Sequence, residues 1–113
     1  MFSRTKTAHL IGIQAVIVEV EIFIGSMGLP SFAVVGLAEG AVKESRERVK
    51  ASLKSLDFNI FAKPITINLA PADFKKAGKP SSIPAAIGLL MASGHIKGNI
   101  DDTLFIGELS LDG

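Results

Sequence analysis

The alternation of side chains between residues 16 and 24 predicts a β-strand. Aliphatic residues recur with a period of two, and two carboxylates, Glu19 and Glu21, fall between them. This period places the aliphatic side chains on one face of a strand and the carboxylates on the other. Residues 8–13 form an earlier apolar run, which we expect to be a separate strand, with a turn near residues 14–15.

A short third strand is predicted over residues 32–35. Residues 25–30 contain two glycines and a proline, which is typical of a turn. Three strands in succession with short links between them predict an antiparallel meander.

The period becomes helical between residues 39 and 56. Val49, Leu53 and Leu56 share one stripe, and charged residues cover the other side, so we expect an amphipathic helix at the surface. Glu44 and Arg48 are four residues apart with the acid first, a spacing that stabilises a helix by about 0.3 kcal/mol.

The second half of the chain predicts a strand, a buried helix and a last strand. Residues 64–69 are rich in β-branched side chains, and residues 83–93 are apolar on all sides, with Ser82 or the serine before it as a helix cap. Residues 104–111 form the predicted last strand. The order β-β-β-α-β-α-β defines an α+β fold with one mixed sheet and two helices. Its final crossover should be right-handed by default.

Composition narrows the class of protein. The 113 residues are 48% hydrophobic, enough for one domain with a core. Twelve basic and eleven acidic residues give a net charge of +1, which excludes a strongly basic nucleic-acid arm. No cysteine and two histidines exclude thiolate and multi-histidine metal sites. The apolar run over residues 10–24 is too short and too polar for a membrane span, so we expect a soluble, cytoplasmic protein without membrane contact.

Gly78 and Lys79 resemble part of a phosphate-binding loop, but the pattern is incomplete. A P-loop needs a glycine five positions before this pair and Ser or Thr after it. Asp73 and Pro80 occupy those positions. We therefore expect no nucleotide hydrolysis by this chain.

Lys75, Lys76 and Lys79 precede the N-terminus of the predicted buried helix. Free N–H groups and the helix dipole favour an anion there, so these lysines are candidates for contact with a DNA backbone or an acidic partner. The alternative is a solvated loop.

Two further candidates rest on single residue types. Arg46 and Arg48 stand in the charged run 44–48, which predicts either an interface with a carboxylate or phosphate or a solvated face with internal ion pairs. Ser82 is either a nucleophile activated by a lysine or a helix cap.

Six strings of the chain together resemble one known family. They are residues 28–32 (GLPSF), 35–39 (VGLAE), 44–49 (ESRERV), 67–73 (INLAPAD), 83–88 (IPAAIG) and 107–113 (GELSLDG). In this order they closely resemble the N-terminal domain of the bacterial magnesium-chelatase-like AAA+ ATPases, the ComM/YifB family. The resemblance covers nearly the whole chain.

The resemblance implies a fold and a setting for residues 1–113. The fold is the ribosomal protein S5 domain 2-like fold of the Lon protease C-terminal domain, in which the crossover is left-handed. The family continues into a AAA+ module, absent from this chain, that binds ATP and magnesium and forms a homo-hexameric ring. ComM-type proteins are associated with DNA branch migration during natural transformation.

The resemblance also bears on Ser82. This serine replaces an Asp of the family at a place similar to the nucleophile position of Lon-type proteases, whose partner lysine would lie beyond Gly113. We expect a non-catalytic accessory domain that couples the ATPase to DNA or to partners. The alternatives are a Ser–Lys peptidase domain built on Ser82 and a purely structural domain.

Overall fold

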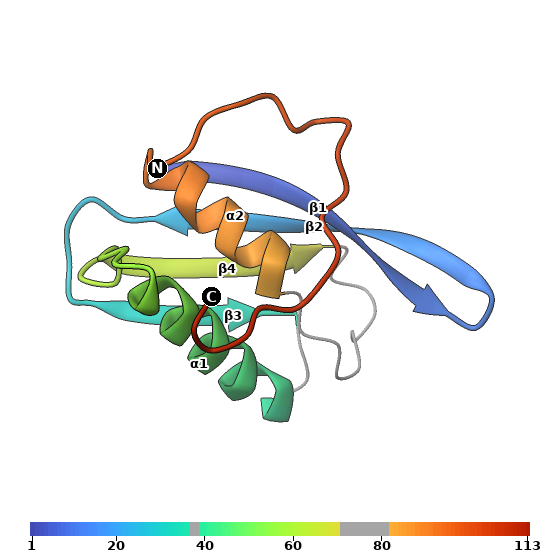
Figure 1. Ribbon diagram of the computed structural model, residues 1–113, viewed down its shortest axis with the longest axis horizontal. Helices are drawn as coiled ribbons and strands as arrows, with labels where there is room; N and C mark the ends of the chain where they lie inside the picture. The colour runs from blue at the N-terminus through green and yellow to red at the C-terminus, as the bar shows by residue number, and fades with distance from the viewer. Residues whose placement is uncertain (37–38, 71–81) are drawn as a thin grey trace.

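The computed structural model describes residues 1–36, 39–70 and 82–113 of the chain. Within these ranges one four-stranded sheet carries two helices on a single face (Figure 1). The elements are β1 (Phe2–Ile11), β2 (Gln14–Ile24), β3 (Ser31–Val35), α1 (Glu39–Ser55), β4 (Pro64–Ala70) and α2 (Ser82–Ala92). The sheet order is β1-β2-β4-β3. Among the four described strands only β3 and β4 pair in parallel, so the predicted α+β class and mixed sheet are confirmed.

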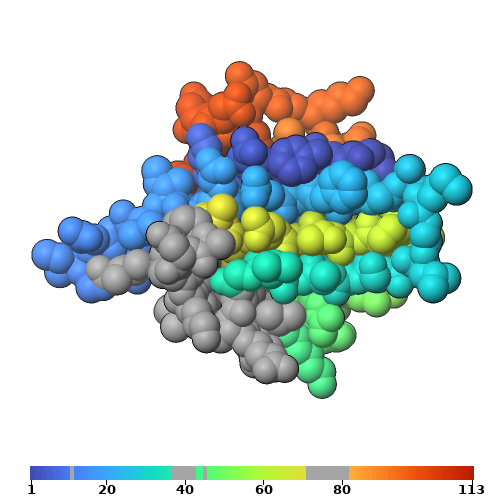
Figure 2. All heavy atoms as spheres, turned by 180° about the vertical axis from the view of Figure 1, so that it is seen from behind, coloured from blue at the N-terminus to red at the C-terminus, as the bar shows by residue number. Residues whose placement is uncertain are grey.

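The alternation along β2 has the predicted consequence. Val18, Val20 and Ile22 are fully buried under the helices. Glu19 and Glu21 point to the other face, where both pair with Arg4 of β1 at 3.2 Å. Seen from behind, the strands themselves form the surface of this open face (Figure 2).

Helix α2 is buried, as its uniformly apolar sequence predicts. Leu89 is fully buried, and the helix packs against β1 and β2. The approach to β2 is so close that a Cβ at Gly88 would lie 2.6 Å from Cγ1 of Ile22. Two hydroxyl groups of β1 fix the helix, because Ser3 and Thr5 donate hydrogen bonds to the carbonyls of Gly88 and Pro84.

Helix α1 also follows the prediction. Val49 and Leu53 are 1% and 2% exposed, and Leu56 lies just beyond the helix end and is half-exposed. The predicted Glu44–Arg48 ion pair is present at 3.2 Å. No helix in the described ranges is long and apolar enough to cross a membrane.

The predicted limits of the first strand and of the turn after it are wrong. The first strand begins at Phe2 rather than at residue 8, and the chain turns at residues 12–13 rather than at 14–15. Gly12 has a φ of +63°. A left-handed residue at this position suits a tight hairpin, and glycine adopts it without strain.

The predicted meander is also wrong, because β4 lies between β2 and β3. Residues 25–30 form a connection long enough to let another strand enter, whereas a two-residue loop would have forced a hairpin. The inward side chains of β4 are 1–3% exposed, while the outer strand β3 is only half-buried on its inner side. β4 therefore lies at the buried centre of the sheet, and β3 lies at its edge.

The predicted last strand does not form in the described residues. Residues 104–111 make a single parallel bridge, between Leu104 and Lys6, and the Phe105 N–H donates to the Lys6 carbonyl at 2.8 Å. The chain does return parallel to β1, but one bridge is not the full crossover that the sequence predicted. The handedness of that crossover, right-handed by default and left-handed by the family resemblance, stays a prediction.

Candidate functional site

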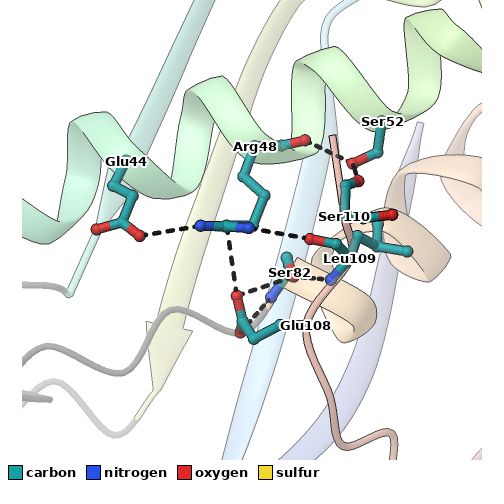
Figure 3. A network of polar contacts seen from close by, with 7 residues as sticks. All are labelled: Glu44, Arg48, Ser52, Ser82, Glu108, Leu109 and Ser110. Carbon is teal, nitrogen blue, oxygen red and sulfur yellow. Dashed lines mark hydrogen bonds and ion pairs between the residues drawn. The ribbon is translucent and has the colours of Figure 1, made fainter. Parts of the chain in front are cut away.

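A network of polar contacts joins both helices to the last residues of the chain (Figure 3). We call it the Arg48–Glu108 cluster. Its members are Glu44, Arg48 and Ser52 of α1, Ser82 at the start of α2, and Glu108, Leu109 and Ser110 of the C-terminal segment.

Ser82 lies at the centre of the Arg48–Glu108 cluster and is fully buried. Its hydroxyl donates to Oε2 of Glu108 at 3.1 Å and accepts the Leu109 N–H at 2.7 Å. The Ser82 N–H donates to Oε1 of Glu108 at 3.3 Å. The Glu108 carboxylate therefore caps the N-terminus of α2, where the helix dipole favours a negative charge.

Arg48 connects α1 to the same segment. Its guanidinium donates to the Leu109 carbonyl at 3.1 Å and to the Glu44 carboxylate at 3.2 Å. Its Nε lies 3.7 Å from Oε2 of Glu108, which is an ion pair but too long for a hydrogen bond. This buried Nε has no hydrogen-bond partner within the described part of the chain.

Ser52 adds a second link between α1 and the C-terminal segment. Its hydroxyl lies 2.6 Å from the Arg48 carbonyl and 2.9 Å from the Ser110 carbonyl, and it shares one hydrogen between them. Ser52 itself is fully buried. The cluster is thus a packing contact among three segments that are far apart in the sequence.

The Arg48–Glu108 cluster explains why the predicted last strand does not form at Leu109 and Ser110. Side chains satisfy both backbone groups of Leu109, because Arg48 takes its carbonyl and Ser82 takes its N–H. Ser52 approaches the carbonyl of Ser110. Backbone groups that are already bonded to side chains do not enter a β ladder.

Arg46 and Arg48, predicted as one interface, lie on opposite flanks of α1. Arg46 donates to the carbonyl of Phe32 in β3 at 3.1 Å. It lines a surface pocket with Phe32, Glu47 and Lys50. The Phe32 ring stacks on Phe61, with 5.6 Å between the ring centroids. Arg46 thus fixes the β3 side of the domain, and Arg48 fixes the C-terminal segment.

The structure describes only some of the other predicted site residues. Lys75, Lys76 and Lys79 lie outside the described residues. The structure brings Ser82 to a carboxylate and a backbone amide, as a buried packing residue would be placed. Glu108 has no predicted role, although it lies in the string over residues 107–113 that resembles the family. In the described ranges no group of three or more His, Asp or Glu is arranged for a metal ion.

The fold and the cluster define a two-layer α+β domain whose buried polar groups bind its own C-terminal segment. The family model for subunit ChlI of Mg-chelatase matches residues 18–113, so the chain belongs to this family.

Three relatives agree with the family assignment. YifB of Escherichia coli, described as uncharacterized, is 44% identical over 112 residues, which are 98% of this chain and 22% of that protein. The competence protein ComM of Haemophilus influenzae is 43% identical over 103 residues, 90% of this chain and 20% of that protein. YifB of Salmonella typhimurium is 41% identical over 108 residues, which are 95% of this chain and 21% of that protein. The resemblance to the ComM/YifB family is confirmed, and the chain spans about a fifth of the length of these relatives.

Proposed function

We propose that this chain is a non-catalytic accessory domain of a magnesium-chelatase-like AAA+ ATPase of the ComM type. In this proposal ATP and magnesium bind to a AAA+ module outside these 113 residues, and a ring of six copies works in the cytoplasm. The observation that carries the proposal is the 43% identity to a competence protein of which the chain covers only 20%. The arrangement of Ser82 adds support, because its hydroxyl is buried and bonded to Glu108 and Leu109.

The Arg48–Glu108 cluster suggests how such a domain would couple to a motor. Glu108, Leu109 and Ser110 are bonded to both helices. A displacement of the chain beyond this segment would therefore act on α1 and α2 together rather than on a loose end. We propose that the cluster transmits movement between the domain and the rest of the protein.

The proposed contact with DNA rests on Lys75, Lys76 and Lys79, which precede α2 in the sequence. The first N–H of this helix is not free for a phosphate, because Glu108 already accepts it. The binding energy would have to come from the lysine side chains. A phosphate contact of this kind weakens as the salt concentration rises, since each neutralised phosphate releases counterions.

The test is a Lys75→Ala, Lys76→Ala, Lys79→Ala variant of the full-length protein, titrated with branched and duplex DNA at several salt concentrations. We expect weaker binding and a salt slope lower by up to about three units, since three phosphate contacts are lost. A Lys43→Ala, Lys50→Ala, Lys54→Ala variant changes the net charge equally and serves as the control. Unchanged affinity and slope in the first variant would contradict the DNA contact and leave a purely structural domain.

A further inference from the structure

The β1–β2 hairpin projects beyond the rest of the sheet, at the right of Figure 1. β4 pairs with β2 only from Glu19 onward, so residues 8–18 form a ribbon of two strands without a third beside it in the described part of the chain. Such a ribbon is only marginally stable in water, and three strands are more stable than two. A third strand beside residues 8–11 would therefore stabilise the hairpin.

Every second residue of β1 directs its backbone N–H and C=O away from β2. In an antiparallel pair, residues that exchange hydrogen bonds with the partner strand alternate with residues that do not. Met1 exchanges two hydrogen bonds with Ile24, at 2.8 and 3.1 Å, so the even-numbered residues of β1 face outward. Within the described residues no hydrogen bond occupies the outward backbone groups of Ala8 and Leu10.

The C-terminal segment already contacts this outer edge at Lys6. The Phe105 N–H donates to the outward Lys6 carbonyl at 2.8 Å, within the parallel bridge between Lys6 and Leu104. In a parallel ladder each outward residue bonds to the two residues on either side of its partner. The same register, continued for four residues along both strands, directs the Leu109 N–H to the Leu10 carbonyl.

The Arg48–Glu108 cluster competes with β1 for this N–H. The Leu109 N–H donates to the Ser82 hydroxyl at 2.7 Å, so pairing with Leu10 requires that Leu109 leaves the cluster. The cluster itself is not fully satisfied. Its buried Arg48 Nε has no hydrogen-bond partner in the described ranges, and the ion pair of this atom with Glu108 is 3.7 Å long. The two sets of partners for the C-terminal segment are mutually exclusive.

We propose that the C-terminal segment alternates between two positions. In the first, shown by the structure, it is bonded to the Arg48–Glu108 cluster. In the second, it pairs with β1 from residue 104 to residue 109 as a fifth strand of the sheet. The hairpin then gains its third strand, and the N-terminus of α2 loses the Glu108 carboxylate. A force on the chain beyond the segment would favour one position, and the inference rests on the proposed function only for the source of that force.

Intramolecular cross-linking in the 113-residue chain, which contains no cysteine, tests the second position. The double variant Leu10→Cys, Ser110→Cys is treated with a short bis-maleimide, and peptides from the monomer fraction are analysed by mass spectrometry. In the structure the Ser110 carbonyl contacts Ser52 of α1, and this helix packs against β3, at the opposite edge of the sheet from β1. In the second position the two cysteines are diagonal neighbours about 7–8 Å apart. We expect a cross-link within single copies of the chain.

Variants of the cluster should change the rate of this cross-link. Arg48→Met should raise it about tenfold, because hydrogen bonds to a charged group are lost from the first position only. Lys43→Met, at an exposed position of the same helix, is the matched control and should leave the rate unchanged. Ser52→Ala removes a single hydroxyl from the cluster and should raise the rate about threefold. It provides the same test if Arg48→Met does not fold.

Amide hydrogen exchange distinguishes an added strand from a loose chain end. In the cross-linked chain the N–H groups of Ala8 and Leu10 should exchange about tenfold more slowly, because the fifth strand bonds them. The inference is overturned by no cross-link in any variant, by equal rates in Arg48→Met and Lys43→Met, or by a cross-link without slower exchange. These measurements use neither ATP nor DNA, so their failure leaves the proposed function standing. A failed DNA titration, in turn, leaves the two positions of the segment standing.

Discussion

Arg46 and Arg48 are two positions apart on α1 and contact different parts of the molecule. Arg48 is bonded to Glu44 and Leu109 and paired with Glu108, and its side chain is 31% exposed. Within the described residues Arg46 has one hydrogen bond, to Phe32, beside a surface pocket. Residues two apart on an α-helix are turned by about 200°, so they do not face the same neighbour. The residues of a charged run should therefore be grouped by their position around the helix before they are assigned a shared role.

The largest effect should come from Arg48→Met in the 113-residue chain, which keeps the apolar stem and removes the guanidinium. In the variant the Leu109 carbonyl loses its hydrogen-bond donor, and the Glu108 carboxylate loses the cation of its ion pair. We expect the free energy of unfolding to fall by about 2 kcal/mol, the scale of hydrogen bonds to a charged group. Urea unfolding measures the change, with Lys43→Met as the exposed control on the same helix. A loss no larger than that of the control would contradict the difference between the two arginines.

A smaller effect is expected for Glu108→Gln. The amide keeps an oxygen that can accept from the Ser82 N–H, but it loses the charge that faces Arg48 and the N-terminus of α2. We expect a loss of about 1 kcal/mol in the free energy of unfolding. In the Arg48→Met background the same substitution should cost much less, because the two side chains then no longer interact. Full additivity in this double-mutant cycle would show that Arg48 and Glu108 are not coupled.

The smallest effect is expected for Arg46→Met. Among the described residues the variant loses one hydrogen bond, to Phe32 at a partly buried site, so the free energy of unfolding should fall by about 0.5 kcal/mol. The same urea titration measures it. A loss equal to that of Arg48→Met would remove the distinction between the two flanks of α1.

The sequence predicted those features that depend on local periodicity. Both helices begin and end within one residue of the predicted limits, and the inward face of β2 is the predicted one. Helical stripes and strand alternation depend on residues that are close together in the chain, so a single sequence is enough to predict them. The neighbour of β3 was not predictable in this way, because an uncharged five-residue strand is compatible with several positions in a sheet.

The candidate site was predictable only in part. The sequence marks Arg48 and Ser82 as candidates, but their partner Glu108 lies 60 and 26 residues further along the chain. The apolar residues around Leu109 predict a strand by their pattern. The side chains of Arg48 and Ser82 bind the backbone of Leu109 instead, and a local pattern contains no signal for such long-range contacts.

The central claim is that Ser82 has a packing role in a non-catalytic domain, and a serine-reactive fluorophosphonate probe tests it most directly. The full-length protein is incubated with the probe in the presence and absence of ATP and DNA, beside an active serine protease as positive control. The peptide that contains Ser82 is then analysed by mass spectrometry. We predict no labelling of Ser82, because its hydroxyl is buried and bonded to Glu108 and Leu109. Labelling at Ser82 that is lost in a Ser82→Ala variant would contradict the account and support a peptidase.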